Sequence, residues 1–535
     1  MAHKPTEEQS AIIYHDFRVE PTLIVQAAAG TGKTTTLRLL AEANRSKRMI
    51  YLAYNKAIAE EGKKRFPSNV EVRTAHSMAY AAVGKRYAHK LEGDIRPARV
   101  KDELSYAVTR LPSGKGKNAD EEDLSVSRYA YAHACVGMVK RWLSTADPLP
   151  GTVAEAERQG LMNPVSVNSF GKDPLLKGMR EIWSRMISVN DELPMLHDGY
   201  LKLFQLEQAE LAEAGQPTAL SGYDVILFDE AQDANPPITD MVMRQSAAKV
   251  IVGDPHQAIY AFRGAEDALA RFGDGGAGQG VAWKYLLTSF RFGPEVAVAA
   301  NMMLGVKGEK TAVVGKGPSS RVRPRLDKKK EPHVLLTRSN GEILEEAINS
   351  LEANERFALI GGIQGTRLWE VVDVLNLREG QKDRIKDPGI KSFDSFNELK
   401  QSIKGASDPD LEKKVDLVNR FGKGLPKMIK QIEQADVGEK KADRAHRIFC
   451  TAHKAKGLEW SRPVMLGNSF PKIFRDKERR ALNPDLDEQE FNLLYVAVTR
   501  AMGDLVLPED LFALYERAVK RFASASRPPA EKAGA

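Results

Sequence analysis

A chain of 535 residues is too long for one hydrophobic core, so several domains are expected. Hydrophobic and charged fractions of 42% and 28% exclude a disordered or fibrous protein, and no apolar run is long enough to cross a bilayer. The N-terminus MAHKPTEEQ lacks a signal-peptide core, and two cysteines exclude a disulfide framework, so we expect a cytoplasmic protein without a membrane partner. The net charge of +7 favours a polyanionic partner without identifying it.

The stretch TLIVQAAAGTGKTTTLRLL organises the rest of the chain. Thr22–Val25 resembles a buried strand, Ala27–Gly32 is a turn of small residues, and helical spacing begins at Lys33. Small residues let backbone N–H groups approach phosphate oxygens, and the helix N-terminus adds a favourable dipole. Lys33 would hold the β- and γ-phosphates, and Thr34 would bind Mg²⁺. This order predicts a nucleotide triphosphate site with the contact residues Ala28, Ala29, Gly30, Thr31, Gly32, Lys33, Thr34 and Thr35.

Strand-like segments at 49–53 and 70–73 alternate with helical segments, which indicates parallel βαβ units. Ligands of such sheets bind beyond the carboxyl ends of the strands. Each polar residue at these ends is by itself typical of a helix cap or a packed side chain, but together they suggest a groove. These residues are Tyr54, Asn55, Thr74 and His76.

A carboxylate pair follows the apolar strand Tyr223–Phe228. Asp229 would hold Mg²⁺, and Glu230 would orient or deprotonate the attacking water. An acidic turn is the weaker interpretation, because a phosphate loop precedes this pair in the correct order.

The next strand, Lys249–Val252, leads into a segment that combines polar, aromatic and basic residues. Gln257 can sense the γ-phosphate, and Tyr260, Phe262 and Arg263 follow it closely. Stacking of a base on an aromatic ring contributes roughly 1–3 kcal/mol and tolerates any base sequence. This segment could therefore connect the state of the phosphate to a nucleic-acid surface.

Four other segments are less informative. Thr6–Gln9 predicts a helix N-cap, the glycine-rich Phe272–Trp283 predicts a hinge or linker, and Ser524–Ala535 predicts a disordered end. The basic run Lys307–Lys330 is equally compatible with a solvated loop and with a contact to backbone phosphates.

Several motifs occur in a fixed order from Gln9 to about Leu507: AAAGTGKT, FDEAQD, GDPHQAIYAFRGA, SFR, TAHKAKGLEW and LLYVAVTRA. In this order the chain resembles a UvrD/Rep-type superfamily 1 DNA helicase. LAYNKAIAEE, RTAHSMAY, HDGYLKLFQL and IKDPGIKSF with SFNELK make it most similar to the F-box DNA helicase branch and its prokaryotic and viral relatives. No F-box-like segment precedes Gln9, so recruitment of a partner through an F-box is not expected.

The resemblance implies an α/β fold with two RecA-like P-loop NTPase domains, each carrying a mainly helical insertion. The expected parts are domain 1A (1–86 and 217–284), insertion 1B (87–216), domain 2A (285–370 and 445–523), a small insertion 2B (371–444) and the tail 524–535.

The resemblance also assigns roles to residues. Gln9 and Phe290 would recognise and stack adenine, with Phe290 replacing the commoner tyrosine, and Glu459 would contact the ribose. Arg291 and Arg500 would reach the γ-phosphate as arginine fingers, which can be worth roughly 10³–10⁵ in rate. The implied single-strand track comprises Thr74, His76, Phe262, Arg263, Thr451 and His453, joined by Tyr54, Asn55 and Tyr260 from the strand-end argument.

The resulting hypothesis is an ATP- and Mg²⁺-dependent 3′→5′ helicase acting on single-stranded DNA and junctions in repair or recombination, monomeric on DNA. Two alternatives remain: a translocase that displaces a recombinase or other protein from DNA, and an ATP-gated DNA-binding subunit of a nuclease or defence complex.

Overall fold

The computed structural model describes residues 4–95, 97–105, 121–261, 264–274, 280–391, 393–400, 409–474, 483 and 486–525. Its contacts divide the chain into two units, Met1–Ala27 with Lys33–Leu286 and Ala28–Gly32 with Leu287–Ala535. Each unit contains a six-stranded parallel sheet, which confirms the α/β class. None of the described helices combines the length and the apolarity that crossing a membrane requires.

The first sheet has the strand order β3-β2-β6-β7-β1-β8. Alternate residues of its central strands enter two separate cores, one on each face, as expected for a parallel sheet covered by helices on both sides. Its strands are β1 (Thr22–Ala27), β2 (Met49–Leu52), β3 (Val70–Arg73), β6 (Val225–Phe228), β7 (Ala248–Gly253) and β8 (Val281–Leu286).

Helices connect and cover these strands. Thr6 caps the first helix through a reciprocal hydrogen-bonded box with Gln9, which confirms the predicted N-cap. The helices and 3₁₀ turns are α1 (Glu7–Ile13), α2 (Lys33–Ala43), α3 (Lys56–Arg65), α4 (Ala75–Ala82), η2 (Ala231–Asp233), α11 (Pro236–Met243), η3 (Pro255–Gln257) and α12 (Ala268–Asp274).

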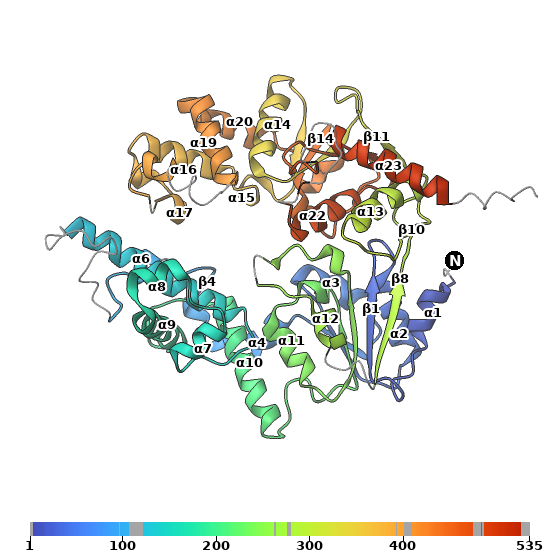
Figure 1. Ribbon diagram of the computed structural model, residues 1–535, viewed down its shortest axis with the longest axis horizontal. Coiled ribbons are helices and arrows are strands. Elements are labelled where there is room, and N and C mark those ends of the chain that lie inside the picture. Colours follow the sequence, from blue (N-terminus) through green and yellow to red (C-terminus); the bar gives the residue numbers. More distant parts are fainter. Residues whose placement is uncertain are drawn as a thin grey trace, which may run out of the picture. The chain divides into compact units, whose positions relative to one another are not determined.

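A helical region between β3 and β6 has a hydrophobic core that continues into α4 and to Met241 of α11. This core includes the rings of Trp142 and Trp183, whose centroids are 4.8 Å apart. Helices α6, α8 and α9 of the region gather to one side of β1 and β8 (Figure 1). The region consists of η1 (Gly84–Lys90), β4 (Leu91–Glu92), α5 (Pro97–Val100), α6 (Glu121–Leu143), α7 (Val153–Arg158), α8 (Pro164–Phe170), α9 (Lys172–Ile187), β5 (Met195–Leu196) and α10 (His197–Glu213).

The second sheet has the order β11-β16-β15-β12-β14-β13, and a two-stranded pair, β9 with β10, lies outside it. The strands are β9 (Thr288–Ser289), β10 (Val314–Gly315), β11 (Arg321–Arg323), β12 (His333–Thr337), β13 (Phe357–Leu359), β14 (Arg447–Thr451), β15 (Val464–Leu466) and β16 (Asp504–Val506).

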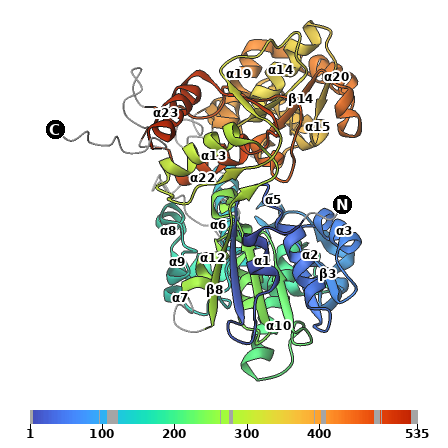
Figure 2. The same cartoon turned by 90° about the vertical axis from the view of Figure 1, so that its right-hand side faces the viewer.

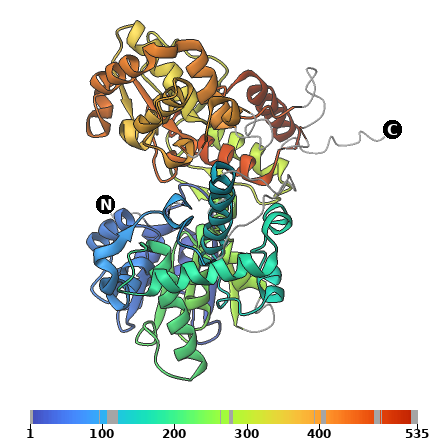
Figure 3. The same cartoon turned by 90° about the vertical axis from the view of Figure 1, so that its left-hand side faces the viewer.

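Helices of the second unit form two groups. Within this unit, α13, α22 and α23 lie on one side and α14, α19 and α20 on the other (Figure 2), and the opposite view shows the same division (Figure 3). They are α13 (Pro294–Val306), α14 (Asn340–Glu352), α15 (Gly362–Gly365), α16 (Trp369–Arg378), η5 (Lys382–Arg384), α17 (Pro388–Lys391), α19 (Pro409–Phe421), η6 (Gly422–Gly424), α20 (Leu425–Ala435), η7 (Glu439–Arg444), α21 (Ala452–Ala455), α22 (Glu488–Val498) and α23 (Glu509–Ala525).

Two expectations about local structure require correction. The segment Phe272–Trp283 is not simply a linker: Phe272 lies in α12, and Val281–Leu286 forms the edge strand β8 paired with β1. The preceding glycines suggested a linker, and β8 itself shows no continuous apolar run because exposed residues interrupt it.

The basic run Lys307–Lys330 contains strands β10 and β11 and is not a plain loop. Residues 526–535 of the predicted disordered end lie outside the described residues.

Candidate nucleotide and nucleic-acid sites

The loop after β1 has the backbone that a phosphate cradle requires. The dihedral φ is 76° at Gly30 and 79° at Gly32, in the left-handed region that side chains disfavour. Lys33 opens α2, and its Nζ donates to the carbonyl oxygen of Ala27 at 3.3 Å. The Thr31 hydroxyl closes the turn by donating to the carbonyl of Ala28 at 3.0 Å. The lysine ammonium therefore folds back over the loop, so these residues fit a bound triphosphate.

The other residues predicted at this loop differ in exposure. Ala28 and Ala29 are buried, whereas in the first turn of α2 Thr34 is half-buried and Thr35 is exposed. A half-exposed hydroxyl beside the loop is placed to reach a metal ion that also contacts the phosphates.

The predicted carboxylate pair follows β6 directly. Asp229 is buried, and its Oδ1 accepts the backbone N–H of Glu230 at 2.9 Å. Glu230 has a φ of 53°, a left-handed conformation that is uncommon for a side-chain-bearing residue and that typically marks a functional turn. Burial and the adjacent Glu230 raise the pKa of Asp229 to about 6. Such a pair of acids is suited to a cation.

A hydrogen-bonded chain connects this pair with the next strand end. Gln232 donates through Nε2 to Glu230 Oε2 at 2.6 Å, and its Oε1 accepts the backbone N–H of Asp254 at 3.0 Å. Asp254 in turn accepts from Gln257 Nε2 at 2.7 Å. A side chain at Gly253 would lie 2.5 Å from Gln232 Oε1, so this strand end requires glycine. The predicted γ-phosphate sensor Gln257 is therefore connected to Glu230 by hydrogen bonds through Asp254 and Gln232.

Among the described residues, no group of three histidine, cysteine or acidic side chains could hold a metal ion. Mg²⁺ is commonly held by one or two protein oxygens together with the phosphates of a nucleotide. Thr34 and Asp229 supply that kind of donor set, so the residues fit Mg²⁺ bound together with ATP.

The residues expected to contact adenine occupy separate units. Gln9 is 8% exposed, and its side chain accepts the N–H of Thr6 at 3.1 Å. Phe290 is 39% exposed in the second unit, to which Gly30 also belongs, and its N–H donates to the carbonyl of Gly30 at 2.9 Å. Phe290 exposes part of its ring to solvent, and Gln9 has a helix-capping partner.

Both expected arginine fingers are engaged within the second unit. Arg291 pairs with Glu459 at 2.6 Å and donates to the Thr499 carbonyl at 3.2 Å. Arg500 is 1% exposed and donates to the carbonyls of Val496 and Leu458 at 2.9 and 3.2 Å. A role at the γ-phosphate would require these guanidinium groups to exchange partners. The roles of Arg291, Arg500 and Glu459 stay predictions.

Two predicted DNA-contact tyrosines come together although they follow different strands. The rings of Tyr54 and Tyr260 are stacked with centroids 6.1 Å apart and an angle of 12° between their planes. Tyr54 is 40% exposed, so the pair presents an aromatic surface at the carboxyl edge of the sheet. Phe262 and Arg263 lie outside the described residues.

The polar members of this groove also serve the local fold. Asn55 caps α3 and Thr74 caps α4, as the simpler interpretation of each predicts. His76 lies one residue into α4, and its Nε2 is 3.1 Å from Asp198 Oδ1 at the start of α10. The ring of Tyr200 meets the His76 ring edge-on with centroids 6.2 Å apart. The helical region therefore helps to orient a residue of the predicted track.

Thr451 and His453 lie at the end of β14 in the second unit. Thr451 is buried at the N-cap position of α21, and His453 is half-buried within that short helix. Their placement at the carboxyl edge of the second sheet agrees with a ligand-contact position, and contact with DNA stays a prediction.

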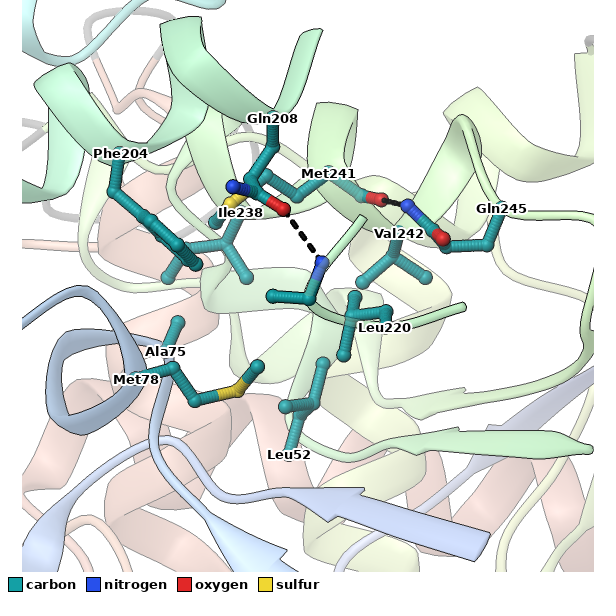
Figure 4. A pocket seen from close by; sticks show the side chains of 11 residues that line it. Leu52, Ala75, Met78, Phe204, Gln208, Leu220, Ile238, Met241, Val242 and Gln245 are labelled. Atoms are coloured by element: carbon teal, nitrogen blue, oxygen red, sulfur yellow. Dashed lines mark hydrogen bonds between the residues drawn. The ribbon is translucent and has the colours of Figure 1, made fainter. Parts of the chain in front are cut away.

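A small cavity lies beneath the groove of the first unit, between α4, α10 and α11 (Figure 4). Its volume is about 10 Å³, at the lower limit of what a single water molecule needs. Its polar neighbours are bonded elsewhere, because Gln208 accepts the N–H of Ala219 and Gln245 donates to the carbonyl of Met241. It is a packing gap and not a ligand site.

The basic run Lys307–Lys330 is largely committed to internal ion pairs. Arg321 and Arg323 both pair with Asp504, at 2.6 and 3.1 Å. Others pair with acids of α14 and α22, such as Lys328 with Glu346 at 3.1 Å. These pairs favour a structural role over a phosphate-contact surface.

Sequence reasoning missed Gln232, Asp254, Asp198 and Tyr51, whose side chains contact predicted site residues. Gln232 and Asp254 lie inside quoted motifs, so their position was a usable signal. Nothing in the sequence pairs Tyr51 with Asp229, because 178 residues separate them.

Comparison with known proteins agrees with the geometry. The model of the UvrD/REP helicase N-terminal domain matches residues 6–270, and that of the UvrD-like helicase C-terminal domain matches residues 349–508. The chain is 30% identical over 549 residues to F-box DNA helicase 1 of Gallus gallus and 31% identical over 540 residues to F-box DNA helicase protein 1 of Schizosaccharomyces pombe.

These alignments cover 97% of this chain in both cases but only 50% and 59% of the two relatives. The chain therefore spans little more than half of the length of these relatives. The matched models follow one another in the order expected for one family and reach both sheets. The chain belongs to the UvrD/Rep helicase family.

Proposed function

We propose that this protein is an ATP-dependent DNA helicase that moves 3′→5′ along single-stranded DNA. The observation that carries the proposal is the convergence of Lys33, the Asp229–Glu230 pair and Gln257 at the carboxyl ends of strands of one sheet, beside the stacked Tyr54–Tyr260 pair. Matches to both halves of the helicase family support it.

At the nucleotide site, Lys33 would hold the β- and γ-phosphates, and Thr34 and Asp229 would hold Mg²⁺, which neutralises phosphate charge when bound. Glu230 would orient or deprotonate the attacking water, and Gln257 would respond to the γ-phosphate. The bonds from Glu230 through Gln232 and Asp254 to Gln257 make the last two roles interdependent.

The subdivision of the chain follows from the same proposal. We assign residues 87–216 and 371–444 as insertions in two RecA-like domains, because each holds a run of helices between strands of one sheet. ATP bound by residues of both domains would favour a closed state, and hydrolysis would remove that preference, so that each cycle advances the protein along the strand.

Unwinding of duplexes with a single-stranded 3′ or 5′ tail tests the proposal. We expect ATP-dependent strand separation with the 3′ tail and little with the 5′ tail. Efficient unwinding from the 5′ tail alone would contradict the direction.

A parallel assay with a protein block on single-stranded DNA distinguishes a helicase from a protein-displacing translocase and from an ATP-gated subunit. Protein displacement without strand separation would favour a translocase. Slow hydrolysis with neither activity would favour an ATP-gated subunit of a larger complex.

A further inference from the structure

Tyr51 lies on the strand between the edge strand β3 and β6 of the first sheet. It belongs to β2, where it is fully buried and pairs in register with Leu227 of β6. Side chains two residues apart on a strand share a face, so Tyr51 lies on the same face as Leu227 and Asp229. The tyrosine ring therefore extends along the sheet toward the carboxyl edge that carries the predicted metal ligand.

The Tyr51 hydroxyl donates a hydrogen bond to Asp229 Oδ2 at 2.6 Å, a distance typical of a hydroxyl on a carboxylate. The other oxygen of Asp229 accepts the backbone N–H of Glu230. Each carboxylate oxygen thus has one fixed donor and keeps a further lone-pair direction. Two donors on different segments determine how the carboxylate plane is turned.

The phenol itself is rigidly held. Its ring packs on that of Phe66 with centroids 4.6 Å apart, within the core that also holds Ala59 of α3 and Val72 of β3. The phenol supplies the hydrogen between the two oxygens, so Tyr51 donates and the Asp229 carboxylate accepts.

We propose that Tyr51 is a positioning residue that orients Asp229 for Mg²⁺ bound with ATP. The inference rests on the proposed function, since it takes Asp229 as a metal ligand. Hydrogen-bond partners of metal-binding carboxylates fix their orientation, and loss of such a partner typically lowers metal affinity about 10- to 100-fold.

The test is the substitution Tyr51→Phe, which removes one oxygen and keeps the ring. Mn²⁺ binding to the full chain with a non-hydrolysable ATP analogue is measured by electron paramagnetic resonance. We expect Mn²⁺ affinity to fall about 10-fold. Binding of the analogue in EDTA should stay unchanged, because Tyr51 acts only through the metal ligand.

Tyr223→Phe is the matched control. The Tyr223 hydroxyl also donates to a carboxylate, that of Glu71, at 2.7 Å in the same unit. Its loss should leave Mn²⁺ affinity unchanged. An equal decrease in both variants would show a general effect of losing a tyrosine hydroxyl and would overturn the inference.

A double-mutant cycle adds a measurement that does not depend on the size of the single effect. If Tyr51 acts through Asp229, Tyr51→Phe should change Mn²⁺ affinity little once Asp229→Asn is present. Additive effects, or wild-type affinity in Tyr51→Phe, would overturn the inference. Failure of the wild-type protein to bind Mn²⁺ with the analogue would instead overturn the proposed function.

Discussion

The two six-stranded parallel sheets differ in what occupies their carboxyl edges. In the first unit, β1 ends in a loop with two left-handed glycines and Lys33. In the second unit, β12 leads to Ser339, the N-cap of α14, and a carboxylate of the protein itself serves the neighbouring amides: Glu342 accepts the N–H groups of Asn468 and Ser469 at 2.7 and 3.0 Å.

This difference explains why only one of the two sheets is expected to bind a triphosphate. Backbone amides at a strand end attract an anion, and in the second unit Glu342 supplies it. The adjacent Arg338 is likewise engaged by Glu490 at 2.8 Å. The sequence Gly-Lys-Thr occurs only once in the chain, at 32–34. Four predictions test this contrast between the two sheets.

Lys33→Ala should reduce ATP turnover by more than ~10²-fold, because the phosphates lose the cation at the phosphate loop. Binding of single-stranded DNA, measured by fluorescence anisotropy, should remain. Lys63→Ala, which removes an exposed lysine paired with Glu60, is the control and should hydrolyse ATP normally. Substantial turnover in Lys33→Ala would place the hydrolytic site elsewhere, including the second sheet.

Tyr260→Ala should weaken binding of single-stranded DNA roughly 5- to 150-fold, since one stacked base contributes roughly 1–3 kcal/mol. Tyr260→Phe keeps the ring beside Tyr54 and should bind nearly as well as the wild type. Tyr14→Ala, which removes a tyrosine that is 76% exposed, is the control. Unchanged affinity in Tyr260→Ala would remove the aromatic surface from the proposed track.

The second unit should lose stability at acidic pH through His333 of β12. Burial lowers the pKa of His333 to about 4, against 6.5 in the unfolded chain. The unfolded state therefore binds the proton first as the pH falls below about 6.5, and the free energy of unfolding should drop by about 2 kcal/mol between pH 7 and pH 5. Chemical denaturation of the wild type and of His333→Phe checks this, and an equal loss in both would exclude His333 as its source.

Glu342→Gln should destabilise the second unit by about 1–2 kcal/mol, because glutamine keeps one acceptor oxygen and its NH₂ group cannot accept the second N–H. ATP turnover should stay near the wild-type value. The measurement is chemical denaturation together with steady-state hydrolysis. If the variant bound a second nucleotide, or lost turnover at unchanged stability, Glu342 would not act only as the internal anion at the carboxyl edge of the second sheet.

Most of the strands and helices that were predicted correctly show local patterns in the sequence. The strand, loop and helix at Thr22–Ala43 are contiguous, so the sequence displays them directly, and the fold class followed from similar alternation elsewhere. Strands β8 and β11 were not predicted because a glycine-rich stretch runs into β8 and two of the three residues of β11 are arginines.

Interactions between distant segments could not be predicted in the same way. The Tyr54–Tyr260 stack and the Tyr51–Asp229 hydrogen bond depend on strand order and register, which a single sequence does not reveal. Likewise, the internal partners of Arg291 and Arg500 follow from packing of the second unit and not from their motifs.

The proposed coupling of ATP hydrolysis to DNA is tested most directly by the hydrolysis rate of the wild-type protein. This rate is measured for the protein alone, with single-stranded DNA and with RNA of the same sequence. We predict slow hydrolysis by the protein alone and strong stimulation by DNA, with weaker stimulation by RNA. Hydrolysis that no polynucleotide accelerates would contradict the account.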